Sequence, residues 1–306
     1  MTVFALIGLS LPVWHAQLPG ETLHWLGDLA VHWQWAYAVA GAVAAVACCL
    51  LARGPARRWA VAAALAVVGL VLLNLHVFSL PALSAPTTPT APAVALRIVS
   101  FNLHMDNDRA QDVLAWLDAQ SADVVALVEV SSGMAALTQA LANRYPHAVQ
   151  RPRDDPFGMA VFARYPLQGA FAGEGAAHHW AGTLQAPTGA VALHVLHPMP
   201  PISAADLAAR DSLLAGIGAE PAPPAGRLVL GDFNSTPWAA GMRAMGERGL
   251  ARASGLTPTW SLGASLPLDH ILASRAHWRV AEHGTGPQLG SDHRPVWAVL
   301  QAQPLN

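Results

Sequence analysis

The chain has 306 residues, enough for one large domain or two ordinary ones. Apolar residues make up 53% of it and charged residues only 12%, a composition that argues against an ordinary soluble enzyme and predicts membrane segments. All 17 basic residues are Arg, and the formal net charge is −2, so nothing in the composition indicates an electrostatic footprint for a nucleic-acid backbone. The cysteines, Cys48 and Cys49, are adjacent within an apolar run, which argues against a disulfide or metal site and favours small apolar packing residues.

The first 80 residues are predicted to anchor the chain in a membrane. Residues 1–14 are apolar but short for a span, and they lack the basic start of a signal peptide. Residues 15–34 mix His, Trp and acidic side chains, as an interfacial segment does. Residues 36–52 and 59–80 each form an apolar run of about the length that a membrane helix needs.

The short segment Arg53–Arg58 separates these two apolar runs and carries three Arg. Positively charged loops remain on the cytoplasmic side of a membrane. We therefore expect this loop in the cytoplasm and the chain after residue 80 on the opposite side, which for a bacterial cytoplasmic membrane is the periplasmic side.

Residues 81–94 are rich in Pro, Thr and Ala, a composition typical of a semi-extended linker. Residues 95–303 have the composition of a soluble α/β domain. Apolar runs bounded by turn residues predict strands at 95–101, 123–130, 158–164, 190–197, 227–233, 268–273, 278–282 and 295–301, and helical patterns cover 109–119, 135–144, 204–217 and 238–247. Strands separated by helices predict a layered domain with sheets at its centre.

The segment Arg227–Pro237 combines a buried strand, a polar pair and a helix start. Gly231 ends the strand and permits close approach of a backbone or ligand. An extended chain would place Asp232 and Asn234 on one face and turn Phe233 into the core. A site at a strand end is one interpretation, and an Asx-type turn that closes a strand is the other.

Further polar residues recur at the ends of predicted strands. Glu129 follows five apolar residues, where a lone carboxylate is costly to bury without a partner or a metal. Each of these residues alone fits a strand-end turn, and together they predict a site on a rigid scaffold. They are Asn102, Glu129, His197, Asp232, Asn234, Asp269, Asp292 and His293. His194 would point to the opposite face of its strand from His197, and it is interpreted as a structural histidine.

Seven motifs in chain order resemble those of the endonuclease/exonuclease/phosphatase superfamily, whose members include deoxyribonuclease I. They are Ser-Phe-Asn102, Val-Glu129, Phe-Gly-Met-Ala-Val-Phe-Ala-Arg164-Tyr-Pro, His197-Pro, Gly-Asp232-Phe-Asn234, Leu-Asp269-His and Gly-Ser-Asp292-His293. The resemblance covers residues 95–301, and the pairing of Gly-Asp-Phe-Asn with a terminal Ser-Asp-His is highly specific. A membrane-anchored bacterial branch carries hydrophobic helices before this domain, and the chain resembles that branch most.

The resemblance implies an α/β fold, a four-layer αββα sandwich with two sheets face to face, here preceded by hydrophobic transmembrane helices. It implies hydrolysis of phosphate esters with Mg²⁺ or Mn²⁺. Such hard cations prefer oxygen ligands, which Asn102, Glu129 and Asp292 would supply.

The resemblance also assigns catalytic roles. Asp232 and Asn234 would hold the attacking water and a non-bridging oxygen. Asp269 would fix the tautomer of His293, which binds the phosphoryl group or takes the water's proton. Whether the aspartate or the histidine is the base remains open at this point. His197 matches a second histidine that assists the leaving group.

The chain departs from the family pattern in ways that bear on its substrate. Val128 stands where a Gln commonly precedes the glutamate, which removes a hydrogen-bonding group. Basic and aromatic loops that grip a duplex are not evident, and from residue 81 onward 14 Arg face 17 acidic residues. Arg151, Arg153 and Arg210 are open to two interpretations, a contact with a substrate phosphate or an ordinary surface charge.

The sequence therefore predicts a membrane-anchored phosphodiesterase or phosphatase acting on lipid head groups or nucleotides. An extracytoplasmic nuclease is one alternative, and the lack of a basic surface argues against it. A non-catalytic, membrane-tethered binding module is the other, and the retention of every ligand-type residue argues against that. Neither an organic cofactor nor an obligate protein partner is indicated.

Overall fold

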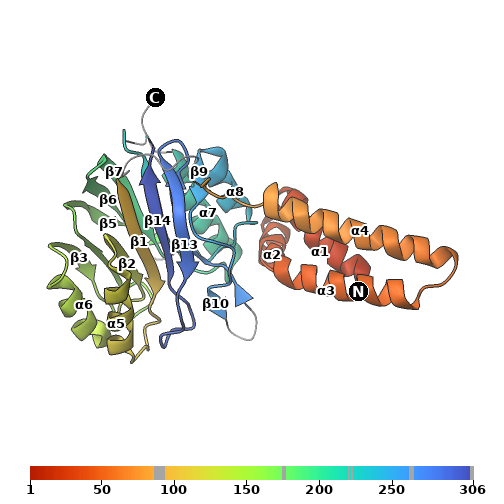
Figure 1. Ribbon diagram of the computed structural model, residues 1–306, viewed down its shortest axis with the longest axis horizontal. Coiled ribbons are helices and arrows are strands. Elements are labelled where there is room, and N and C mark those ends of the chain that lie inside the picture. The colour runs from red at the N-terminus through yellow and green to blue at the C-terminus, as the bar shows by residue number, and fades with distance from the viewer. Residues whose placement is uncertain (86–93, 174–176, 220, 222, 262–264, 304–306) are drawn as a thin grey trace.

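The structure, a computed structural model, describes all residues except 86–93, 174–176, 220, 222, 262–264 and 304–306. Two six-stranded sheets face each other, with helices on their outer faces and an N-terminal helical bundle projecting to one side (Figure 1). The predicted four-layer αββα arrangement, preceded by apolar helices, is confirmed.

The first sheet has the strand order β13-β14-β1-β2-β4-β3. Only β1 and β2 are parallel, so the carboxyl ends of these two strands meet at one edge. The helices α5 (Ala110–Gln120) and α6 (Ala135–Ala142) cover the outer face, and the 3₁₀ helix η2 (Ser132–Met134) leads into α6. The strands are β1 (Ala95–Asn102), β2 (Val124–Val128), β3 (His147–Arg151), β4 (Met159–Ala163), β13 (Trp278–Thr285) and β14 (Val296–Ala302).

The second sheet has the order β5-β6-β7-β8-β12-β9, with β7 and β8 parallel. The helices α7 (Ala204–Ala219) and α8 (Ala240–Glu247) cover it, and a short hairpin is formed by β10 (Trp260–Ser261) and β11 (Ser265–Leu266). The strands are β5 (Leu167–Ala172), β6 (His179–Ala186), β7 (Gly189–Leu196), β8 (Arg227–Asp232), β9 (Leu250–Arg252) and β12 (Asp269–Ser274).

The central strands are buried on both faces, which explains their nearly continuous apolar runs. In β1, Ile98 points into the core between the sheets, whereas Val99 and Phe101 pack under α5 and α6. In β8, Leu228 and Leu230 enter the same inter-sheet core, whereas the outward-facing residues of that strand pack under α7 and α8. Successive side chains of a central strand therefore pack alternately into the core between the sheets and the core under the helices. Packing on both faces fixes the position of the strand ends.

The N-terminal bundle contains α1 (Thr2–Trp14), the 3₁₀ helix η1 (His15–Gln17), α2 (Glu21–Val31), α3 (Gln34–Leu51) and α4 (Pro55–His76). By length and composition, α3 and α4 are suited to crossing a membrane. Where they meet α1, the Asn74 side-chain amide donates to Gln34 Oε1 at 2.7 Å and to Leu9 O at 2.9 Å. The Asn74 amide nitrogen therefore links α4 to both α1 and α3.

The segment that follows the bundle, which includes Leu80 and Leu83, runs along the second sheet. Leu80 N donates to Pro237 O at 2.7 Å, and Leu83 N donates to Arg252 O at 2.6 Å. Leu80 and Leu83 are buried. The bundle is therefore packed against the α/β domain through this segment, and residues 86–93 of the predicted linker lie outside the described part of the chain.

We predict that His194, on β7, makes stability fall in mild acid. Burial, together with the charge of nearby Arg227, lowers the pKa of His194 to about 4. The unfolded chain takes up a proton near pH 6.5 that the folded chain does not, so this stabilisation is present above about pH 6.5 and is lost as pH falls toward 4. The loss between about pH 7.5 and 5.5 is about 1.4 kcal/mol.

Urea unfolding of the detergent-solubilised protein at both pH values checks this. The acid-induced loss should be smaller by that amount in His194→Leu than in the wild-type chain. The control is His283→Leu, at an exposed position on β13, which should keep the wild-type difference. An unchanged pH dependence in His194→Leu would contradict the prediction.

Candidate active site

Strand topology brings the predicted polar residues to one edge of the sandwich. Asn102 ends β1 and Glu129 follows β2, its parallel neighbour. On the facing sheet, His197 follows β7 and Asp232 ends β8, again a parallel pair. Antiparallel pairing then places Asp269, the first residue of β12, directly opposite Asp232. Carboxyl ends of parallel strands share one edge of a sheet, so residues far apart in the chain converge.

Asn102 links the two sheets at this edge. Its Nδ2 donates to Glu129 Oε1 at 2.8 Å and to Asp232 Oδ2 at 3.1 Å. Its Oδ1 accepts from His104 N at 2.9 Å, and Met105 N donates to Glu129 Oε2 at 3.2 Å. The Asn102 amide therefore holds two carboxylates of like charge beside each other.

His197 lies against the same two carboxylates. Its Nδ1–H donates to Pro156 O at 2.9 Å, which leaves Nε2 facing the site. Nε2 lies 3.6 Å from Glu129 Oε1 and 3.7 Å from Asp232 Oδ2.

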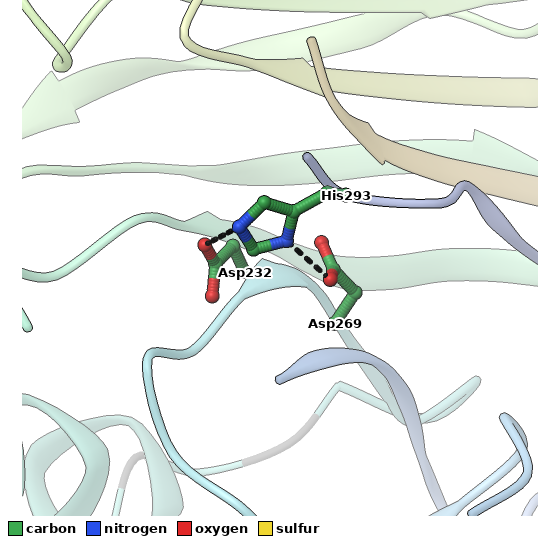
Figure 2. Close-up of side chains that lie close together, drawn as sticks. All are labelled: Asp232, Asp269 and His293. Carbon is green, nitrogen blue, oxygen red and sulfur yellow. Dashed lines mark hydrogen bonds and ion pairs between the residues drawn. The ribbon is translucent and has the colours of Figure 1, made fainter. Parts of the chain in front are cut away.

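His293 is clamped between two buried aspartates (Figure 2). Its Nδ1–H donates to Asp269 Oδ2 at 2.7 Å, and its Nε2 lies 3.5 Å from Asp232 Oδ2. Burial acts to lower the pKa of His293, but the two carboxylates outweigh it and raise the pKa to about 10. Burial raises the pKa of Asp269. The imidazolium is the stable form at neutral pH because carboxylates face both ring nitrogens.

The backbone around Asp232 is specialised. Gly231 has φ of 134°, and a Cβ there would lie 2.0 Å from Leu196 O, so the predicted close backbone approach is real. Asn234 has φ of 45°, its N donates to Asp232 Oδ1 at 2.8 Å, and its Nδ2 donates to Pro198 O at 2.9 Å. Phe233 is buried as predicted. The Asx-type turn and the site, offered as alternatives from the sequence, therefore occur together.

Glu129 also has a positive φ of 55°. A non-glycine residue in this region is held there by its surroundings, and such residues cluster at functional sites. Val128, which precedes it, packs in the apolar core between the sheets and is 1% exposed. The hydrogen bond to Glu129 comes instead from Asn102 and from the backbone of Met105.

Asp292 reaches the site from the loop before β14. Its Oδ2 accepts from Trp260 Nε1 at 3.0 Å, and it lines the same cleft as Glu129. The neighbouring Ser291 Oγ donates to Asn102 O at 2.8 Å, which ties this loop to the end of β1. The role of Asp292 as a metal ligand stays a prediction.

The cleft above these groups has a volume of about 460 Å³. Its floor is polar, with Glu129, His197, Asp232, Asn234, Asp292 and His293. Its walls are largely apolar and include Leu29, Trp33, Phe157, Met199, Pro200, Pro201, Trp260, Leu266 and Leu268. Three lining residues, Leu29, His32 and Trp33, come from the N-terminal region, which sequence reasoning assigned to the membrane interface alone.

The donor set fits a divalent cation. Among the described residues, Asp232, Asp269 and His293 offer ligand atoms that all lie within 4.8 Å of one another. The carboxylate of Glu129 adds to the negative charge through its shared contact with Asn102. Three carboxylates beside two imidazoles carry excess negative charge even with His293 protonated, which a cation would neutralise.

The three arginines for which the sequence left two interpretations, Arg151, Arg153 and Arg210, lie in different settings. Arg153 Nε donates to Asp155 Oδ1 at 2.8 Å, as the paired-turn interpretation predicted. The Arg151 guanidinium lies over the Phe171 ring, 5.5 Å from its centroid. Arg210 is fully buried and paired with Asp28, so it is neither a surface charge nor a residue of the cleft lining.

His270, the neighbour of Asp269, faces away from the site as strand alternation predicts. Its Nε2–H donates to Ser235 O at 2.9 Å, and its ring packs edge-on against Phe233. Burial lowers the pKa of His270 to about 4. A neutral, buried ring in this position supports the loop after β8.

A two-sheet sandwich with clustered carboxylates and imidazoles at one edge defines the class of the protein. The model of the Endonuclease/Exonuclease/phosphatase family matches residues 99–293, and the chain belongs to that family. No curated protein sequence matches the chain.

Solved structures share the fold at low sequence identity. An endonuclease/exonuclease/phosphatase from Beutenbergia cavernae is 20% identical over 68% of this chain and 72% of its own, with a TM-score of 0.55. The human Nocturnin catalytic domain is 18% identical over 68% and 95%, with a TM-score of 0.55. Sphingomyelinase C from Streptomyces griseocarneus is 19% identical over 67% and 99%, with a TM-score of 0.50. The matched share of this chain is about what the sandwich occupies.

We predict that Asp269 and His293 act as a unit. Asp269→Asn, His293→Ala and the double variant should lose similar amounts of phosphoesterase activity, because effects within such a unit are strongly non-additive. Each loss should reach ~10²–10⁴-fold, the range for a positioned acid–base group. Initial rates of the three variants, measured on one phosphate ester, check this.

The matched control is His270→Ala, which alters the neighbouring histidine on the opposite face of β12. It should cost less activity than His293→Ala. Single losses that multiply in the double variant, or a larger loss in His270→Ala, would contradict the prediction and direct attention to Asp292 as the partner.

Proposed function

We propose that the chain is a membrane-anchored, divalent-metal-dependent hydrolase of phosphate esters, a phosphodiesterase or phosphatase. The single observation that carries this is the polar floor of the cleft, where Asn102 holds Glu129 and Asp232 together beside two histidines. Family membership supports a phosphoesterase, and the oxygen-rich donor set supports Mg²⁺ or Mn²⁺.

Glu129 is the main carboxylate ligand in this proposal, with Asp292 supplying a further oxygen, and Asn102 would supply another after rotation of its amide, which now turns Nδ2 toward the carboxylates. When bound, the cation polarises a phosphoryl oxygen and stabilises the charge that develops in the displacement. Asp232 is held near the same position by Asn102.

Asp232 and Asn234 hold the attacking water and a non-bridging oxygen of the phosphate. Because the raised pKa keeps His293 protonated at neutral pH, its Nε2–H donates to the phosphoryl group. The base is then Asp232, whose Oδ2 lies 3.5 Å from that nitrogen. His197 Nε2 faces the cleft and assists the leaving group.

Two features support an ester smaller than a nucleic-acid duplex. The cleft walls are apolar, whereas duplex binding depends on Arg and Lys contacts to many phosphates. From residue 81 onward, acidic residues outnumber Arg, 17 to 14. These features favour a phosphate ester with an apolar part, such as a phospholipid, over extracytoplasmic DNA or RNA.

Membrane anchoring is supported by the outward faces of α3 and α4. Val39, Val43, Leu50, Trp59, Leu65 and Leu72 are each more than half exposed. Such continuous apolar surface is rare on soluble monomers but is required in contact with lipid. We propose residues 1–80 as the anchoring region, 81–94 as the linker and 95–303 as the catalytic domain.

Hydrolysis assays on the purified chain test the function. The protein should cleave bis-(p-nitrophenyl) phosphate or phospholipid with Mg²⁺ or Mn²⁺, and a chelator should abolish turnover. Glu129→Ala should weaken metal binding in calorimetry and reduce turnover by ~10²-fold or more, with the fold retained by circular dichroism. Plasmid DNA should be cleaved poorly in the same panel.

Arg151→Ala is the control, since it removes a charge outside the cleft lining and should keep the wild-type metal dependence. Unchanged Mg²⁺ dependence in Glu129→Ala would count against that ligand. Absence of turnover on every phosphate ester in the panel would leave the binding-module alternative.

We also predict the topology. The turn between α3 and α4 lies at the end of the bundle farthest from the sheets (Figure 1), so both chain ends of this hairpin are on one side. Three Arg at the turn support a cytoplasmic turn, with residues 81–306 on the opposite side of the membrane. A reporter fused after Asn306 that works only in the cytoplasm would refute this. Replacing Arg53, Arg57 and Arg58 with Gln should increase the fraction of inverted chains.

A further inference from the structure

We propose that helix α2, which lies before the family's matched region, forms one wall of the substrate cleft and binds the apolar chain of a phosphate ester. The proposal rests on the function proposed above and names Leu29 and Trp33 as its specificity-determining residues.

A buried ion pair fixes α2 to the catalytic loop. Arg210 NH2, on α7, donates to both carboxylate oxygens of Asp28 at 3.0 Å. Arg210 NH1 donates to Asn234 O at 3.0 Å, so one guanidinium joins α2 to the turn after β8. Burial acts to raise the pKa of Asp28, but His32 and Arg210 outweigh it and hold the pKa well below its usual range. Asp28 is 1% exposed and Arg210 is fully buried, so separating them would leave two uncompensated charges.

Two further hydrogen-bonding groups lie on the same helix and the residues after it. His32 Nε2–H donates to Asp28 Oδ2 at 3.2 Å, and Nδ1 lies 2.9 Å from Thr236 Oγ1. Trp25 Nε1–H donates to Pro201 O at 2.7 Å. The helix is thus bonded to both loops that border the cleft, the one after β7 and the one after β8.

The residues that α2 and its end present to the cleft are apolar. Leu29 and Trp33 line it together with Met199, Pro200 and Pro201 from the loop after β7, and with Trp260 and Leu266 from the β10–β11 hairpin. Glu129, Asp232 and His293 form its floor. A fully polar ester would bind the floor and leave this wall in contact with water, whereas an ester with an alkyl chain would bury it.

The wall adjoins the candidate membrane helices, which identifies the occupant. Trp33 directly precedes Gln34, the first residue of α3, and Figure 1 shows α2 at the end of the bundle nearest the sheets. With α3 in a bilayer, the cleft opens close to the membrane surface, where amphiphilic phosphate esters are concentrated. The ligand of the wall is therefore the alkyl or acyl chain of such an ester, with its phosphate on the polar floor.

Alkyl p-nitrophenyl phosphodiesters from the methyl to the hexyl ester test the wall. For the wild-type chain with Mg²⁺, kcat/KM should rise about fourfold for each methylene that becomes buried. In Leu29→Ser and Trp33→Ser, the hexyl ester should lose at least about tenfold, whereas the methyl ester stays within about threefold. Leu26→Ser, at a half-exposed position on α2 outside the cleft lining, is the control and should keep the wild-type dependence.

Binding without turnover separates this proposal from the proposed function. Calorimetry of the Mg²⁺-loaded protein should show hexylphosphonate binding more tightly than methylphosphonate, and Leu29→Ser should abolish that difference. If the protein shows this binding difference but hydrolyses no ester, the wall is supported and the proposed function fails.

Three outcomes would contradict the proposed role of Leu29 and Trp33 as an apolar wall of the cleft. One is a wild-type kcat/KM that is independent of chain length while the methyl ester is hydrolysed. Another is a chain-length dependence that Leu29→Ser and Trp33→Ser leave intact. A third is equal binding of the two phosphonates by the wild-type protein.

Discussion

The architecture of the site depends on a single oxygen atom, Asp232 Oδ2. It accepts a hydrogen bond from Asn102 Nδ2 at 3.1 Å and lies 3.5 Å from His293 Nε2 and 3.7 Å from His197 Nε2, so three nitrogens from separate strand ends converge on it. A buried carboxylate beside two others is stable only when such donors or a cation offset the repulsion. Gly231 makes the convergence possible, because a Cβ at that position would collide with the backbone of Leu196 on the neighbouring strand β7.

Most of the sandwich was predictable because its central strands are buried on both faces and form apolar runs of the right length. Within the two large sheets the missed strands were β3, β5, β6 and β9, which lie at or next to the sheet edges, are short or are partly exposed, and the two-residue strands β10 and β11 of the separate hairpin were also missed. In β5 and β6, Gly169 and Gly182 sit opposite each other against the Trp180 ring, where a Cβ would not fit, so side-chain alternation is interrupted. These strands are specified by their neighbours rather than by their own pattern.

In the site too, residues fixed by the buried central strands were predictable, whereas a contact between distant segments was not. Polar residues at strand ends were predicted to converge, and Asn102, Glu129, His197, Asp232, Asp269 and His293 do so, because register in a buried sheet is strongly determined. The pairing of Asp28 with Arg210 was not predictable, since 182 residues separate the two and each has an ordinary local setting. The spacing of Asp28 and His32, four residues apart on one helix face, was the available signal, but it does not identify a distant partner.

That pair makes the N-terminal bundle part of the site rather than a passive anchor. Arg210 bonds Asp28 with one nitrogen and Asn234 O with another, so α2 cannot shift without disturbing the turn that presents Asn234. Fixing α2 in advance also removes the entropy cost of ordering a cleft wall when substrate binds. A domain separated from its bundle would keep the polar floor but lose Leu29 and Trp33, and with them the apolar surface proposed to bind an alkyl chain. The ion pair therefore joins α2 to the turn that presents Asn234, and in the proposed function residues before the family's matched region would take part in the choice of substrate.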